Sequence, residues 1–146
     1  MAGKFKLQSV LNYRQSLENQ AQQVLAASLQ RQNELETQLQ QQQQNLQQHD
    51  GELKQRQQEG LTVAEIDLYE SQIQHCRRLI KDMQGRLQQL DPQIVSERKE
   101  LLHAARERQV MEKLKDKQEA EYRQELSRKE RVMLDEISLR NKGNNS

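Results

Sequence analysis

The segment Glu59–Ile66 has the sequence Glu-Gly-Leu-Thr-Val-Ala-Glu-Ile and separates two long stretches of polar residues and leucine. Gly60 can adopt the left-handed backbone conformation that ends a helix without a Cβ penalty. Thr62 with Glu65 three residues later predicts a reciprocal capping box, in which each residue caps the other at the start of a second helix. These signals predict a bend at residues 58–62 that joins two helices into a hairpin.

The composition favours long helices over a globular core. Hydrophobic residues make up 33% of the chain, aromatic residues 3% and charged residues 31%. The common residues are good helix formers, and the chain contains only five glycines and one proline to interrupt them. We therefore expect an all-α protein, a single long antiparallel two-helix coiled-coil hairpin over residues 1–146.

The first arm, residues 5–57, carries one narrow stripe of apolar or small residues, which predicts a coiled-coil seam. Between Leu29 and Leu39 an extra four-residue step predicts a stutter in the supercoil. The run Gln40–Gln44 is interpreted as a solvated helix face rather than an interaction tract, and Gly51 as a weak point in a continuous helix. The stripe consists of Leu7, Val10, Leu11, Leu17, Ala21, Val24, Leu25, Leu29, Leu35, Leu39, Leu46 and Leu53.

The second arm, residues 63–140, has apolar residues at alternating steps of three and four. Pro92 falls inside this run without shifting its phase, so we expect a kinked continuous helix. The alternative is a new helix with Asp91 as N-cap and Pro92 in its first turn. Residues 141–146 carry no apolar residue and are expected to be disordered. The seam residues are Ile66, Tyr69, Ile73, Cys76, Ile80, Met83, Leu87, Leu90, Ile94, Leu101, Ala104 and Met111.

The two seams can be aligned about the bend. A bend centred between residues 59 and 60 pairs Leu53 with Ile66 and Leu35 with Met83, so the apolar stripes match over most of the first arm. Some seam positions are polar, which costs stability but specifies register. These positions are Arg14, Gln32, Gln42 and His49.

The arms are unequal in length, so the second arm extends past the first. In this register residue 115 meets residue 4, and residues 116–140 have no helix beside them. An unpaired helix with exposed apolar side chains predicts a partner or self-association. The apolar residues of this overhang are Tyr122, Leu126, Val132, Met133, Leu134, Ile137 and Leu139.

Neither enzyme chemistry nor nucleic-acid binding is indicated. His49, His75 and His103 lie far apart, no second ligand pair accompanies His75-Cys76, and no phosphate-binding glycine loop occurs. We expect no catalytic residues, no cofactor and no metal. The net charge of +1 argues against nucleic acid. The absence of a signal sequence or membrane-spanning run predicts a cytoplasmic protein.

Four segments together resemble a known family. In order and spacing they are similar to FliJ, the small coiled-coil component of the bacterial flagellar type III export apparatus. The segments are Phe5-Lys6-Leu7-Gln8-Ser9-Val10-Leu11 with Tyr13-Arg14; Gly60-Leu61-Thr62 with Glu65 and Tyr69; Arg98–Leu102 with Ala104-Ala105, Glu107-Arg108 and Glu112-Lys113-Leu114; and Glu130 with Leu134–Ile137 and Arg140.

The resemblance implies a stalk that inserts its open end into the hexameric ring of the flagellar export ATPase. It implies that the half near the bend contacts the cytoplasmic domain of the export gate, which would place the protein peripherally at the inner face of the membrane. It also implies binding of empty export chaperones. The equivalent stalk of a virulence secretion system and a structural tether without an ATPase partner are the alternatives.

The resemblance also implies roles for particular residues. Four residues of the overhang are expected at the ATPase ring, namely Val132, Met133, Leu134 and Ile137. Four residues along one side of the second helix are expected at the export gate, namely Tyr69, Gln72, Cys76 and Leu79. Tyr69 and Cys76 have an alternative interpretation as seam residues alone.

Overall fold

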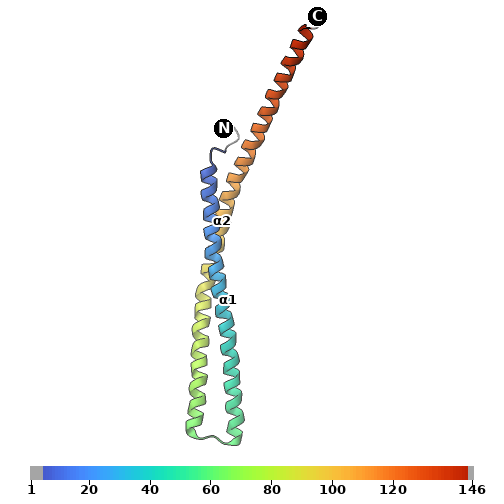
Figure 1. The fold of residues 1–146 in the computed structure, drawn as a ribbon. Helices are drawn as coiled ribbons and strands as arrows, with labels where there is room; N and C mark the ends of the chain where they lie inside the picture. Colours follow the sequence, from blue (N-terminus) through green and yellow to red (C-terminus); the bar gives the residue numbers. More distant parts are fainter. Residues whose placement is uncertain (1–4, 145–146) are drawn as a thin grey trace. The chain divides into compact units, whose positions relative to one another are not determined.

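The computed structural model describes residues 5–144, which form two α-helices and no strand. Helix α1 (Gln8–Glu59) and helix α2 (Val63–Asn144) are joined by residues 60–62 (Figure 1). The predicted all-α hairpin of two long helices packed against each other is confirmed. Helix α2 includes residues 141–144, which we expected to be disordered, whereas residues 145 and 146 lie outside the described part.

The chain divides into two compact units, and both helices contribute to each. We call residues 21–100 the bend unit, because it contains the connection between the helices. We call the described residues of 1–20 and 101–146 the terminal unit.

The connection has the local geometry that its sequence predicts, with one difference. Gly60 has a φ of 98°, and the backbone N–H of Glu65 donates to Thr62 Oγ1 at 3.2 Å. Thr62 therefore caps the start of α2, as predicted. The Glu65 carboxylate, which we expected to cap in return, instead accepts a hydrogen bond from Arg56 Nη2 at 3.1 Å. The carboxylate thus links the two helices across the bend.

The seam of α1 is an unbroken heptad pattern. From Leu11 to Leu53, one series of buried and half-buried residues recurs at alternating steps of three and four, with further half-buried residues beside it, and the predicted stutter is absent. The prediction was wrong because Ser28 and Gln32 occupy seam positions, and a count of apolar residues alone omits them. The seam residues are Leu11, Arg14, Glu18, Ala21, Leu25, Ser28, Gln32, Leu35, Leu39, Gln42, Leu46, His49 and Leu53.

Three apolar residues that we assigned to the α1 seam are exposed, namely Leu7, Val10 and Val24. Each of them directly precedes a buried or half-buried residue, namely Gln8, Leu11 or Leu25. Because neighbouring residues on a helix are rotated by about 100°, the three side chains point away from α2. The polar residues expected in the seam, Arg14, Gln32, Gln42 and His49, are half-buried there.

The seam of α2 has the same unbroken pattern from Ile66 to Tyr122. It passes through Pro92 without a break in the helix, and the proline side chain is exposed. The expected continuity of the helix is therefore confirmed. The seam residues are Ile66, Tyr69, Ile73, Cys76, Ile80, Met83, Leu87, Leu90, Ile94, Glu97, Leu101, Ala104, Arg108, Met111, Lys115, Gln118 and Tyr122.

The two seams pair one heptad away from the predicted register. Leu35 forms a buried cluster with Leu90 and Ile94 instead of facing Met83. Leu53, expected opposite Ile66, lines the same hollow as Ile73. Both differences equal seven residues, and a heptad pattern matches itself after such a slip. The apolar pattern alone therefore could not distinguish the two registers.

The described helices are predominantly polar along their whole length. Within residues 5–144, no helix contains an apolar segment long enough to cross a membrane.

Candidate functional site

The end of α2 is the most exposed part of the terminal unit. Tyr122 is the last half-buried residue, and every residue from Arg123 to Lys142 is exposed. The uncovered segment begins seven residues later than the predicted Asp116. This difference follows from the register, because a shift of one heptad lets α1 and the buried Phe5 before it cover one more heptad of α2.

Apolar side chains on this segment form a stripe along one side of the helix. Tyr122, Leu126, Met133 and Ile137 are separated by four, seven and four residues, which places them within an arc of about 60° on an α-helix. We call these four residues the apolar stripe. It begins at the last half-buried seam residue, so it continues the face that is covered closer to the bend.

The four residues expected at the ATPase ring are all exposed. Met133 and Ile137 belong to the apolar stripe, with exposed fractions of 62% and 50%. Val132 and Leu134 flank the stripe on either side, since neighbouring residues on a helix are rotated by about 100°. The structure therefore brings the four residues together on one exposed end.

The four residues expected at the export gate differ in exposure. Cys76 is only 4% exposed and lies in the seam, whereas Gln72 is exposed. Leu79 is half-buried, and it lines one hollow together with Gln72 and Cys76. Tyr69 is also half-buried, and it lines an adjoining hollow with Gln72. All four thus border the same side of the bend unit.

Residues of α1 that the sequence interpretation did not assign to a site form the opposite wall. Gln42, Asn45 and His49 line the first hollow, and His49 also lines the second. His49 Nδ1 is buried and has no hydrogen-bond partner among the described residues. The polar residues Gln42 and His49 at seam positions are the feature of the sequence that indicates this wall. By itself, a polar seam residue indicates only the register of the two helices.

Tyr69 is held against α1 by an arginine. Arg56 Nη1 donates to the Tyr69 hydroxyl oxygen at 3.2 Å, and the Arg56 guanidinium lies 5.8 Å from the centre of the Tyr69 ring. The hydrogen bond to Tyr69, together with the nearby Glu65 carboxylate, raises the pKa of Arg56 from its ordinary value. Arg56 therefore stays charged and holds the tyrosine ring in place.

A second arginine joins the helices in the terminal unit. Arg108 Nε donates to Glu18 at 2.6 Å, and Arg108 Nη1 donates to Glu112 at 2.7 Å. The hydrogen bond to Glu18 is the main reason why the pKa of Arg108 is raised. Because Glu18 and Arg108 both lie in the seam, this pair helps to specify the register of α1 against α2 in this unit.

His49, His75 and Cys76 line the same hollow. Within the described part of the chain, no group of three or more histidine, cysteine, aspartate or glutamate side chains is placed to hold a metal ion.

Comparisons with known proteins identify the family. No curated protein and no solved structure matches the chain. The family described as the flagellar FliJ protein matches residues 3–146, which is essentially the whole chain. The chain therefore belongs to the FliJ family, a family of structural components of the flagellar export apparatus.

Proposed function

We propose that the protein is the central stalk of the flagellar export ATPase, and that the uncovered end of α2 enters the ATPase ring. The exposure of the apolar stripe is the observation that supports this role. Burial of a leucine-sized side chain contributes about 1.5–3 kcal/mol. Three residues of the stripe, Leu126, Met133 and Ile137, stay exposed in the free protein, and this exposure favours a site of association.

The physical character of the segment also suits insertion into a ring. Residues 123–143 are all exposed, and most helical stability in proteins comes from packing of an apolar face, which this segment does not have in the free protein. A surrounding ring would bury the apolar stripe and stabilise the helix in one step. Charged residues of both signs are spread over the rest of the segment, which favours its solubility before it binds.

The first test is a pull-down of the export ATPase with the double variant Met133→Glu, Ile137→Glu. We expect capture to fall at least tenfold, because two carboxylates would have to be buried in place of apolar side chains. The matched control is Val110→Glu, which alters an exposed apolar residue of α2 outside the stripe. Undiminished capture by the double variant, with an unchanged helical spectrum, would refute the stalk role assigned to this end.

The two adjoining hollows that Tyr69, Gln72, Cys76 and Leu79 line are proposed as the contact surface for the cytoplasmic domain of the export gate. Gln72, Leu79 and the edge of Tyr69 supply the accessible groups, while Cys76 supports them from the seam. His49 completes the surface from α1. This contact would hold the protein at the inner face of the membrane without a membrane-spanning segment of its own.

The gate contact is tested with Gln72→Ala and Leu79→Ala in binding measurements with the purified gate domain. We expect each change to weaken binding several-fold. Gln72→Ala should leave the thermal unfolding midpoint unchanged, whereas Leu79→Ala should lower it slightly because Leu79 is half-buried. Gln88→Ala, an exposed residue of α2 that lines neither hollow, is the control. Equal effects of all three changes would contradict the assigned surface.

The same family membership supports a role in the escort of empty export chaperones, which we include in the proposed function. Competition binding with a purified chaperone and the ATPase would show whether the two partners use the same end of α2. A protein that binds neither partner would instead be a structural tether.

A further inference from the structure

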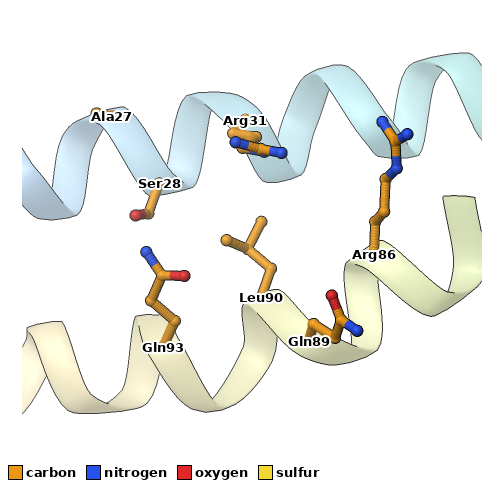
Figure 2. Close-up of a pocket in the computed structure, with 7 residues that line it drawn as sticks. All are labelled: Ala27, Ser28, Arg31, Arg86, Gln89, Leu90 and Gln93. Carbon is orange, nitrogen blue, oxygen red and sulfur yellow. The ribbon is translucent and has the colours of Figure 1, made fainter.

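A further hollow in the bend unit shares no lining residue with the proposed gate surface. It lies between the two helices on the side shown in Figure 2 and has a volume of about 390 Å³. It is lined by Ala27, Ser28 and Arg31 of α1 and by Arg86, Gln89, Leu90 and Gln93 of α2.

The floor of this hollow is partly apolar. Leu90 is buried, and its side chain points into the space between the helices (Figure 2). Two polar groups at one end are already occupied, because Ser28 Oγ and Gln93 Nε2 both donate to Glu97 Oε1 at 3.0 Å. The floor therefore offers a small aliphatic surface rather than further hydrogen-bond donors.

Two cationic side chains stand at the rim, one from each helix. Arg86 Nη2 lies 3.2 Å from Asp82, but both side chains are more than half exposed, so this pair is weak. Arg31 is exposed and has no ion-pair partner among the described residues. Figure 2 shows the two guanidinium groups at different positions along the hollow. Several N–H donors of both arginines therefore remain available.

We propose that this hollow binds an acidic helical segment of a partner protein. Two carboxylates on one face of that segment would meet Arg31 and Arg86, and an aliphatic side chain on the same face would lie over Leu90 (Figure 2). Guanidinium groups bind carboxylates with two parallel hydrogen bonds, and helices commonly dock an apolar face into a groove of this kind.

The position of Glu97 determines at which end of the hollow an anionic group can bind. Its carboxylate is held by Ser28 and Gln93 at one end of the hollow, so an anionic ligand is repelled there and directed toward Arg31 and Arg86. A free inorganic anion would satisfy the arginines but leave the apolar floor uncovered. Two arginines are also too few for strong binding to a nucleic acid.

The test uses the full chain and a designed helical peptide with glutamate at positions i and i+4 and a leucine between them. The matched peptide has glutamine in place of each glutamate. We expect the Nε–H NMR signals of Arg31 and Arg86 to shift with the glutamate peptide only. The single variants Arg31→Gln and Arg86→Gln should each weaken binding about fivefold, the effect of one exposed charge pair.

Arg78→Gln is the control, since Arg78 is an exposed arginine of α2 that does not line this hollow. A fivefold loss with Arg78→Gln as well would mean general charge attraction and would overturn the proposal. Saturable shifts with inorganic phosphate of the same affinity would also overturn it, because they would show a simple anion site. The double variant Met133→Glu, Ile137→Glu and the variant Gln72→Ala should bind the glutamate peptide as the natural chain does. This result would show that the site is independent of the proposed stalk function.

Discussion

At the scale of single residues, the polar layer around Glu97 distinguishes the observed register from its neighbours. Glu97 is 8% exposed, and its Oε1 accepts hydrogen bonds from Ser28 and Gln93, while its Oε2 has no partner among the described residues. In the register one heptad away, Glu97 would lie opposite Ala21, which has no side-chain donor. An unpaired buried carboxylate is costly, so this layer disfavours the slip.

The polar layer should cost stability while it specifies register. We expect Ser28→Ala to destabilise the protein by about 1–3 kcal/mol, because Glu97 loses a hydrogen-bond donor. The double variant Ser28→Ala, Glu97→Leu should recover this loss, since apolar replacement of a buried polar pair is often neutral or stabilising. Urea denaturation followed by circular dichroism measures both changes.

Ser71→Ala, at an exposed position of α2, is the control and should change stability by less than about 0.5 kcal/mol. If the double variant were no more stable than Ser28→Ala alone, the buried layer would not be the source of the cost.

At the scale of elements, the connection between the helices depends on one backbone conformation. Gly60 has a positive φ, and a Cβ atom there would meet nothing within 4 Å. The requirement for glycine at this position is therefore conformational and not steric. Gly51, in contrast, lies inside α1, where its backbone freedom weakens the helix.

The two glycines should respond to alanine with opposite signs. We expect Gly60→Ala to destabilise the protein by about 1–2 kcal/mol, because alanine is strained at positive φ. Gly51→Ala should stabilise it by about 0.5–1 kcal/mol, since the added Cβ meets no atom and alanine favours the helix. Thermal unfolding of the two variants beside the natural chain provides the comparison, and shifts in the same direction would contradict it.

At the scale of the whole molecule, the uncovered end of α2 should be dispensable for folding. A chain that ends at Tyr122 lacks the segment from Arg123 onward. The structure describes residues 123–143 of this segment, and all of them are exposed. We expect the unfolding midpoint to stay within about 2 °C of that of the full chain, because almost no buried surface is lost. The helical signal should fall in proportion to the residues removed.

A shorter chain that ends at Leu114 provides the contrast. It also loses the half-buried Lys115, Gln118, Glu119 and Tyr122, so its midpoint should fall clearly below that of the first truncation. Equal midpoints for the two truncated chains would indicate that α2 is not covered between residues 115 and 122.

Periodicity and local chemistry were sufficient to predict the helices, the bend and the exposed apolar end. Gly60 allows the positive φ of the bend, and the Thr62 side chain caps the start of α2. A heptad pattern identifies which face of each helix is buried. These features depend on neighbours close in the chain. The exposed apolar end could be anticipated because Leu126, Met133 and Ile137 lie beyond the reach of the shorter arm in either register.

The register, the polar members of the seam and the hollows required the packed structure. A heptad pattern matches itself after a slip of seven residues, so only contacts such as Ser28 with Glu97 and Leu35 with Leu90 distinguish the alternatives. The hollow between Arg31 and Arg86 is formed by residues far apart in the sequence. Which side chains of α1 meet which of α2 depends on the long-range pairing of the helices, and no local pattern encodes it.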